Sequence, residues 1–281
     1  MLYTILYYRK NLLNLPVKSE KGIPQMRIVI KVGTSTLAHA TGKLNIRRTS
    51  ELCRVISDLK NAGHEVILVS SGAIGMGVGK LALAQKPDDI PTKQAAAAVG
   101  QCELMYTYDR LFTEFTHTVA QILLTGSDFS APDRHENFNN TIGRLLQLNV
   151  LPIINENDTI ATEEIKVGDN DTLSALVAVS IQADLLVILS DVDGLYSADP
   201  RKDENARLLE EVYEITEETL RLAGGAGSKL GTGGMSTKLH AAQICQKAGC
   251  DMVIANGENP EKLYDIVADQ KGGYTRFYAK G

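Results

Sequence analysis

The sequence predicts a single three-layer α/β/α domain with a mostly parallel central sheet. Apolar runs of strand length alternate along the chain with stretches of helical periodicity, the order that a helix-covered parallel sheet requires. The runs are nearly continuous rather than alternating, as in RIVIKV at residues 27–32, so both faces of each strand are buried. No linker, charge block or internal repeat interrupts the chain after Met26, although two lobes sharing one sheet remain an open alternative.

The predicted strands and helices alternate along the chain. The strands are the buried apolar runs at residues 27–32, 65–70, 117–124, 150–155, 184–190, 251–256 and, as a possible last strand, 275–280. The helices are the periodic stretches at residues 46–62, 92–114, 135–149, 171–182, 235–248 and 260–268. Gly63 directly follows the first of these helices, at the position where glycine commonly ends a helix.

Composition excludes several classes of function. The 281 residues carry a net charge of −5 and only 5% aromatic side chains, which disfavours nucleic-acid binding by basic patches or base stacking. The four cysteines form no C-x-x-C pair, which is typical of reduced thiols in a cytoplasmic protein. The histidines are scattered along the chain, so we identify no metal site directly.

The first 25 residues differ from the rest of the chain. Three of the ten tyrosines fall within the first eight residues, and the apolar patch precedes Arg9 and Lys10, the reverse of the order in a signal peptide. The patch is too short to cross a bilayer, so we expect no membrane partner. We interpret residues 1–25 as an N-terminal extension, disordered or arising from a misassigned start, and residues 26–281 as the functional domain.

Polar and small residues gather where the predicted strands end, and ligands of open α/β sheets bind at those carboxyl ends. The first strand ends in Lys31, followed by Gly33, Thr34 and Ser35. A lysine at the end of a buried strand is costly unless it meets an anion, and the glycine lets the backbone approach a ligand. The alternative is a lysine that extends to solvent.

The second strand ends in a glycine-rich segment, residues 70–80. It is not a phosphate-binding Walker A loop, because Ile74 replaces the first glycine and Leu81 follows Gly79-Lys80. It is a poor dinucleotide-binding motif, because the strand ends several residues earlier and no acidic residue follows at the expected spacing. What remains is a helix N-terminus beside Ser71 and Gly72, suited to a carboxylate or a phosphate.

Acidic and amide residues follow the next strand. Residues 155–158 (NEND) could bind an ammonium group or a metal, or could form a turn stabilised by Asn and Asp side chains. Residues 167–171 (VGDND) precede a helix, and one of them is explained as its N-cap.

Two later segments carry nucleotide-binding chemistry. Ser190 and Asp191 begin a turn that suits contact with a nucleotide, whereas a calcium loop is excluded because its downstream glutamate is missing. Residues 231–238 (GTGGMSTK) place glycines, hydroxyls and a lysine at a helix start, which is typical of phosphate binding. A flexible linker is the alternative for that segment.

Taken together, these motifs resemble the amino acid kinase superfamily, and within it the branch that phosphorylates glutamate. The resemblance is carried by motifs in the family's order: KVGTSTL (31–37), VSSGAIGMG (69–77), NENDTIAT (155–162), VGDNDTLSA (167–175), SDVDGLYSADPR (190–201) and GTGGMSTK (231–238). It implies the amino acid kinase fold and ATP-dependent phosphorylation of the L-glutamate side-chain carboxylate to L-glutamyl 5-phosphate, the first step of proline biosynthesis.

The resemblance also implies roles for particular residues. The catalytic residues would be Lys31, Asp171 and Lys238, with Asp171 holding the two lysines in place. The substrate-binding residues would be Ser71, Gly72, Asp158 and Asn170. The ATP-binding residues would be Lys31, Gly33, Ser190, Asp191, Thr232, Gly233, Gly234, Met235, Ser236, Thr237 and Lys238. Where the family commonly has threonine, Ser190 keeps the hydroxyl group.

The same resemblance implies partners and regulation. Mg²⁺ would enter with ATP, proline would be a feedback inhibitor, and the protein would be a cytoplasmic homo-oligomer that could act beside the next enzyme of its pathway. Many family members carry a C-terminal PUA domain, and we find no such domain in this sequence, so feedback strength and oligomeric arrangement stay open. Two alternatives are phosphorylation of another small acid and nucleotide binding without turnover.

Overall fold

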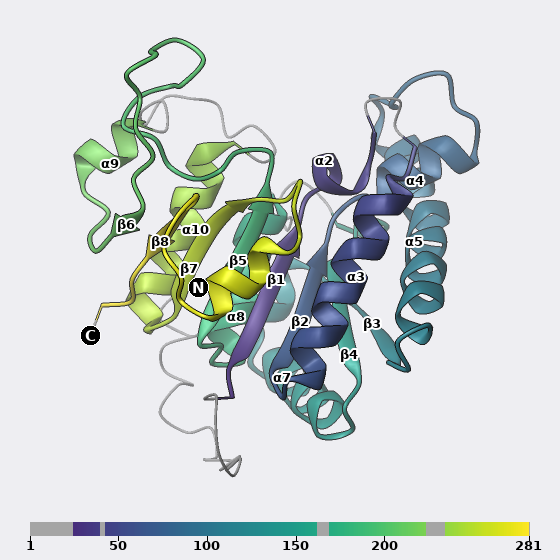
Figure 1. Cartoon of the computed structure of the whole chain (residues 1–281). Coiled ribbons are helices and arrows are strands. Elements are labelled where there is room, and N and C mark those ends of the chain that lie inside the picture. Colours follow the sequence, from purple (N-terminus) through teal and green to yellow (C-terminus); the bar gives the residue numbers. More distant parts are fainter. Residues whose placement is uncertain (1–24, 40–42, 162–168, 223–233, 281) are drawn as a thin grey trace.

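The computed structural model describes residues 25–39, 43–161, 169–222 and 234–280, which build one eight-stranded sheet (Figure 1). The strand order is β3-β4-β2-β1-β5-β7-β8-β6. The strand bounds are β1 (Arg27–Val32), β2 (Glu65–Ser70), β3 (Val119–Leu124), β4 (Leu151–Glu156), β5 (Leu185–Ser190), β6 (Glu211–Val212), β7 (Asp251–Asn256) and β8 (Tyr274–Phe277). In the sheet, neighbouring strands pair in parallel from β3 through β4, β2, β1 and β5 to β7. Strand β8 runs antiparallel to β7, and β6 pairs in parallel with β8.

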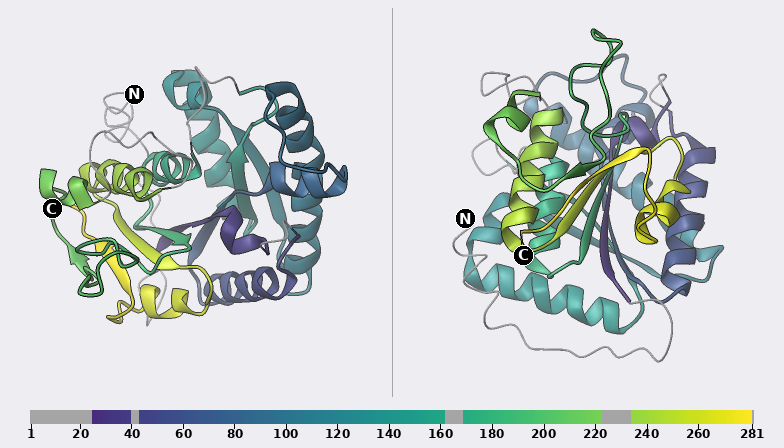
Figure 2. Two further views of the ribbon diagram at one scale, coloured as in Figure 1. Left: turned by 90° about the horizontal axis from the view of Figure 1, so that it is seen from above. Right: turned by 60° about the vertical axis from the view of Figure 1, so that its left-hand side comes forward.

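Helices cover both faces of the sheet, as the view from above shows (Figure 2). The helix bounds are α2 (Thr34–Leu37), α3 (Ile46–Asn61), α4 (Ala73–Lys80), α5 (Ile90–Thr113), α6 (Gly126–Ser130), α7 (Pro132–Gln147), α8 (Asn170–Ser180), α9 (Glu217–Leu222), α10 (Met235–Ala248) and α11 (Lys262–Val267). Alternate residues of each central strand enter opposite cores: Val29 packs with α7, α8 and α10, whereas Ile28 and Ile30 pack with α3, α5 and α11. The predicted three-layer α/β/α fold with a mostly parallel sheet is confirmed.

Most predicted elements are present, and their ends differ by a few residues. The strands at 27–32, 65–70 and 251–256 and the helix at 235–248 match their predicted bounds. The helix predicted from residue 135 begins three residues earlier, because Pro132 occupies its first position, where the missing N–H costs nothing. Strand β6 and helix α9 were not predicted, and β6 has only two residues, which pair with the distant β8.

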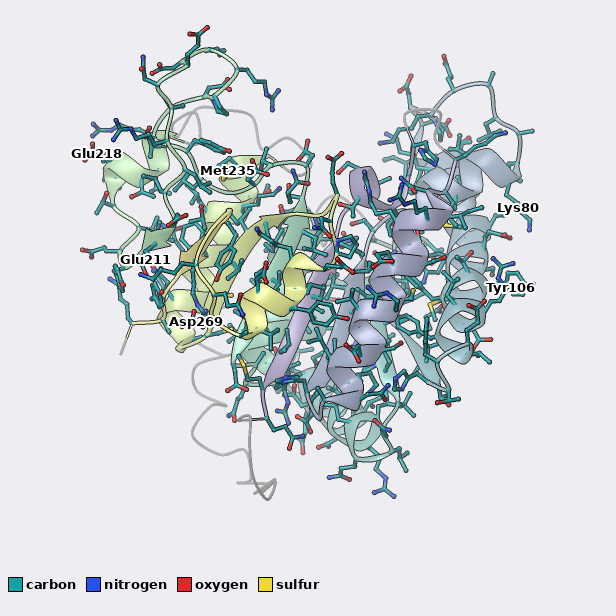
Figure 3. All side chains as sticks on the ribbon, in the orientation of Figure 1. Lys80, Tyr106, Glu211, Glu218, Met235 and Asp269 are labelled. Atoms are coloured by element: carbon teal, nitrogen blue, oxygen red, sulfur yellow. The ribbon has the colours of Figure 1, made fainter. Side chains whose placement is uncertain are left out.

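Helices α4 and α5 pack against each other at the edge of the molecule. A Cβ atom at Gly100 of α5 would overlap the carbonyl oxygen of Ala73, and one at Gly77 of α4 would overlap that of Ala96. Two glycines therefore let the helix backbones approach closely and fix the start of α4 against α5. Lys80 and Tyr106 mark the outer surface of this pair, and Tyr106 is 62% exposed (Figure 3).

The described part of the chain contains no helix that is both long enough and apolar enough to cross a lipid bilayer.

Candidate active site

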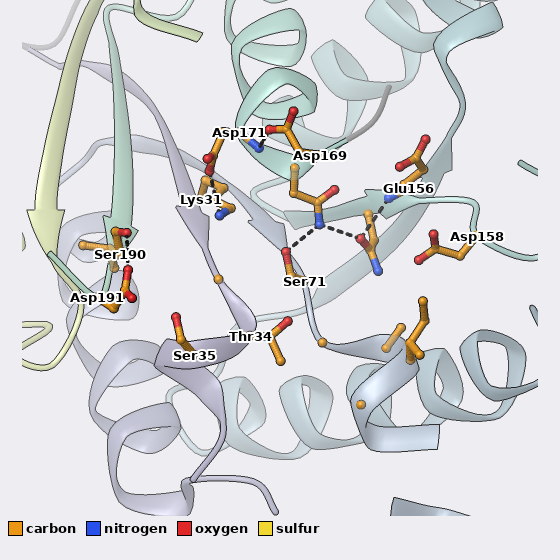
Figure 4. Close-up of a pocket in the computed structure, with 18 of the residues that line it drawn as sticks. Lys31, Thr34, Ser35, Ser71, Glu156, Asp158, Asp169, Asp171, Ser190 and Asp191 are labelled. Carbon is orange, nitrogen blue, oxygen red and sulfur yellow. Dashed lines mark hydrogen bonds and ion pairs between the residues drawn. The ribbon is translucent and has the colours of Figure 1, made fainter. Parts of the chain in front are cut away.

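A cavity of about 540 Å³ opens at the carboxyl ends of β1, β2, β4 and β5 (Figure 4). These four strands are neighbours in the sheet, so segments that are far apart in the sequence meet there. Ten of the predicted site residues line it: Lys31, Gly33, Ser71, Gly72, Asp158, Asn170, Asp171, Ser190, Asp191 and Lys238.

One side of the cavity contains a buried cluster of two lysines and one aspartate. Lys31 Nζ lies 2.7 Å from Asp171 Oδ1, and Lys238 Nζ lies 3.2 Å from Asp171 Oδ2. The side chains of Lys31 and Lys238 are only 8% and 4% exposed, and that of Asp171 is fully buried. With two cations and one anion the cluster carries a net charge of +1, so it favours a negatively charged ligand.

Asp171 is held by more than the two lysines. The hydroxyl of Thr237, on the first turn of α10, lies 2.8 Å from Asp171 Oδ2. Burial alone would raise the pKa of Asp171, but the charges of Lys31 and Lys238, with hydrogen bonds from Lys31 and Thr237, lower it overall. Asp171 is therefore a carboxylate at neutral pH and can fix the positions of both ammonium groups.

Backbone donors from two helix starts face the same cavity. Gly33 precedes α2, and Thr34 and Ser35 begin it beside Lys31. Gly72 precedes α4 with a φ of 108°, a left-handed conformation that favours glycine, and Ala73, Ile74 and Gly75 follow it along the cavity. The first N–H groups of a helix have no partners within the helix, so the start of α4 can bind an anion.

The other side of the cavity combines hydrogen-bonded amides and a hydroxyl with carboxylates. Asn170 Nδ2 donates to Ser71 Oγ over 2.7 Å and to Asn155 Oδ1 over 3.0 Å. Glu156 and Asp158 follow Asn155 at the end of β4 and line the same wall. The NEND segment therefore provides polar groups to the cavity rather than a turn alone.

The predicted nucleotide-binding residues are only partly brought together. Ser190 and Asp191 line the cavity at the end of β5, and the Ser190 hydroxyl donates to Asp191 Oδ1 over 3.0 Å. Gly234 caps α10, and Met235 and Ser236 begin it, but none of the three lines the cavity. Thr237 does not line the cavity either, but its hydroxyl donates to Asp171, which does. Thr232 and Gly233 lie outside the described residues.

Sequence reasoning missed two residues that belong to this region. Lys86, in the connection between α4 and α5, lines the cavity, and no local pattern distinguishes it from other surface lysines. Gln101 of α5 bonds to Asn155 from behind the cavity wall. No sequence signal distinguishes Gln101, because the same helix carries other polar residues such as Gln94 and Glu103.

The carboxylates around the cavity are suited to a metal ion that enters already bound to phosphates. No group of three or more His, Cys, Asp or Glu side chains in the described part of the chain could hold a metal ion by itself. Asp171 is engaged by two lysines, whereas Asp158, Asp169 and Asp191 also border the cavity. Mg²⁺ typically uses one or two carboxylates together with substrate phosphates, which is compatible with this arrangement.

Comparison with known proteins identifies the family of this chain. Residues 26–256 match the family model described as the amino acid kinase family. A glutamate 5-kinase of Clostridium perfringens is 54% identical over 90% of this chain and 96% of its own length. A glutamate 5-kinase of Carboxydothermus hydrogenoformans is 56% identical over 90% of this chain and 68% of its own length. Relatives of two lengths therefore share this domain.

Solved structures share the fold at low sequence identity. A carbamate kinase from Giardia lamblia bound to AMP-PNP matches 92% of this chain and 99% of its own, with a TM-score of 0.65 and 20% identity. A UMP kinase from Ureaplasma parvum matches 91% of this chain and 100% of its own, with a TM-score of 0.62 and 17% identity. On the extent of the family match and the identity to its curated relatives, this chain belongs to the amino acid kinase family, in its glutamate 5-kinase group.

Proposed function

We propose that this chain transfers the γ-phosphoryl group of ATP to the side-chain carboxylate of L-glutamate, giving L-glutamyl 5-phosphate and ADP. The observation that carries the proposal is the Lys31–Asp171–Lys238 cluster, which shares one cavity with Ser71, Asn170 and Asp158. The identity to glutamate 5-kinases supports the choice of substrate.

The nucleophile in this reaction needs no general base. A carboxylate oxygen of glutamate forms a bond to the γ-phosphorus, while the bond from that phosphorus to the β–γ bridging oxygen breaks. The electron pair of the broken bond stays on ADP. The difficulty is to bring one anion against another and hold them in line, so catalysis depends on positioning and on stabilising charge.

The two lysines supply the positive charge. Lys31 and Lys238 neutralise phosphate oxygens of the transferred and leaving groups. The cluster of these two lysines and Asp171 carries its net charge of +1 before the ligand binds. Asp171 orients both ammonium groups because each of its oxygens faces one of them. A carboxylate that borders the cavity, such as Asp191, would help to hold a Mg²⁺ ion that enters with ATP, and the ion would supply further charge neutralisation.

The side of the cavity away from the lysine cluster binds the amino acid. Asp158 pairs with the substrate ammonium group, and Asn170 and Ser71 bind its polar atoms without adding charge. The start of α4, from Gly72 to Gly75, offers backbone N–H groups to a carboxylate or to a phosphate. The Ser190–Asp191 turn and the start of α10 contact the nucleotide.

A coupled assay of ADP formation tests this function. We expect ADP release that depends on L-glutamate and exceeds release with L-aspartate or N-acetylglutamate. Faster turnover of another acid would show that the scaffold has a different substrate. ATP binding without ADP formation under any of these conditions would show a nucleotide-binding protein without turnover.

We further propose proline as a feedback inhibitor, a homo-oligomeric state and a cytoplasmic location, with the next enzyme of the pathway as a partner. All four cysteines are free, which supports a reducing compartment. Glutamate 5-kinases act in proline biosynthesis, and proline is the product of that pathway, which supports proline as the inhibitor. Adding proline to the ADP assay tests inhibition, light scattering measures the oligomer, and co-purification with the next enzyme tests the partnership.

A further inference from the structure

A chain of hydrogen bonds leads from the cavity wall into helix α5. Asn170 Nδ2 donates to Ser71 Oγ and to Asn155 Oδ1, and Asn155 Nδ2 donates to Gln101 Oε1 over 3.0 Å. Gln101 Nε2 in turn donates to Gln121 Oε1 over 3.3 Å. Side-chain amides thereby connect four helices and strands that are separate in the sequence: α8, β4, α5 and β3.

Backbone groups at two points fix the direction of this chain. The N–H of Glu156 donates to the side-chain oxygen of Asn155 over 2.9 Å, and a backbone N–H can only donate. The Nδ2 group of Asn155 must therefore face Gln101, which must present its oxygen. Asn170 Nδ2 also lies 3.4 Å from the backbone oxygen of Ser70, which can only accept. Both anchors give the same orientation of the amides.

This direction determines what the wall offers to a ligand. Both hydrogens of Asn170 Nδ2 are used toward the protein, so its Oδ1 is left as an acceptor beside the cavity that Asn170 lines. Ser71 Oγ already accepts a hydrogen bond from Asn170, so its own proton can be donated to a ligand. An acceptor next to a donor matches the ammonium and carboxylate groups of an α-amino acid.

Gln101 is well placed to hold this arrangement without touching the substrate. It is 7% exposed and does not line the cavity, and Asn155 is 3% exposed. The neighbouring Gly100 packs against the backbone of Ala73, at the start of α4, so α5 cannot shift freely at this point. Leaving a buried donor without its acceptor costs more free energy than an average hydrogen bond contributes to stability.

We propose that Gln101 is a positioning residue for substrate selection: it fixes the Asn155 amide, and through it Asn170 and Ser71, in the orientation that binds a free α-amino acid. The proposal rests on the proposed function, because the amino acid is glutamate there. It adds a determinant outside the cavity that acts on the amino acid and not on the nucleotide.

Two substitutions of Gln101 separate positioning from packing. Gln101→Met keeps the approximate volume but removes the acceptor, so we expect the KM for glutamate to rise about tenfold, with kcat and the KM for ATP within about twofold. Gln101→Glu keeps an oxygen facing Asn155, and we expect its glutamate KM to stay within about threefold of that of the parent chain. Steady-state ADP formation with each substrate varied in turn measures all three parameters.

The control is Thr107→Val on the same helix. Thr107 is buried, and its hydroxyl donates to the backbone oxygen of Glu103, away from the amide chain. We expect a lower melting temperature and an unchanged glutamate KM for this variant. A Gln101→Met enzyme with the parent's glutamate KM, or with equal increases for glutamate and ATP, would overturn the proposal.

The remaining outcomes are also decisive. If Gln101→Met does not fold, Gln101→Glu alone tests the proposal, because a glutamate KM raised tenfold in that variant contradicts it. If the parent chain forms no ADP with glutamate, the proposed function fails by itself. The two variants are then compared on whichever acid the parent phosphorylates, where the same split between KM values is expected.

Discussion

The two sides of the cavity are stabilised by different interactions. The phosphate side consists of buried charges, with Lys31, Asp171 and Lys238 contributed by β1, α8 and α10. The amino-acid side combines a hydroxyl and amides, from Ser71 after β2, Asn155 of β4 and Asn170 of α8, with the carboxylates of Glu156 and Asp158. A net positive charge attracts and stabilises phosphate but selects poorly among anions, whereas directed hydrogen bonds select by the position of donors and acceptors.

Helix α8 joins the two sides. Asn170 and Asp171 are its first two residues, and successive helical residues point about 100° apart, so one faces the amides and the other faces the lysines. The Asp169 side chain caps the helix by accepting from the N–H groups of Asp171 and Thr172. One capped helix start therefore sets the distance between the amino-acid side and the phosphate side.

The largest effect is expected from Asp171→Asn. Removing the carboxylate leaves two buried lysines without a counter-ion, so we expect a loss of about 3 kcal/mol in the free energy of unfolding at pH 7 and a loss of nearly all activity. Urea unfolding and the ADP assay measure these changes. Stability close to that of the parent chain would show that the cluster is not held together by charge.

The pH dependence of the stability difference between the parent chain and Asp171→Asn follows from the pKa of Asp171. Burial would raise this pKa, but the two lysines lower it below its ordinary value of 3.8, so the folded state favours the carboxylate. The stabilisation is fully present above pH 3.8 and is lost as the pH falls through the lower, folded-state pKa. The stability difference between parent and Asp171→Asn should therefore be constant near neutral pH and shrink only in acid.

Substitution of either lysine should chiefly lower the turnover number. We expect Lys31→Ala or Lys238→Ala to lower kcat by about 10²–10³-fold, as for the loss of one preorganised charge donor. Lys80→Ala is the matched control, because Lys80 extends from the outer surface of α4 and pairs with Glu103 (Figure 3). Near-normal turnover of a cavity variant would remove that lysine from the mechanism.

The glycine contact that positions α4 can be tested by stability alone. In Gly100→Ala the new methyl group would overlap the carbonyl oxygen of Ala73, so we expect a loss of about 1–3 kcal/mol. Gly143→Ala in α7 is the control, since its Cβ would meet no atom within 4 Å, and alanine favours the helix. Thermal unfolding should show opposite shifts, and equal shifts would contradict the close contact.

The smallest effect is expected on the amino-acid side. Asp158→Asn keeps the shape of the side chain but removes its charge, so we expect the KM for glutamate to rise about tenfold while kcat changes little. Steady-state kinetics with glutamate and then ATP varied gives the two constants. An unchanged glutamate KM would reject a role for Asp158 in binding the ammonium group.

The sequence by itself determined the order of strands and helices and most of the cavity residues. Continuous apolar runs predicted β1, β2, β5 and β7, because a strand buried on both faces has no polar face to reveal an alternation. Polar residues at the ends of predicted strands, or just after them, predicted Lys31, Ser71, Asp158 and Ser190 at one edge of the sheet. These signals are local, and short stretches of sequence contain them completely.

Only the tertiary structure decided which of these groups meet and in which direction they bond. The two-residue β6 exists because it pairs with β8, more than 60 residues away, and Gln101 matters because folding places it behind Asn155. Neither relation leaves a periodic pattern in the sequence. The orientation of each amide depends on the backbone groups of Glu156 and Ser70 that face it, and these are fixed only when the strands have assembled.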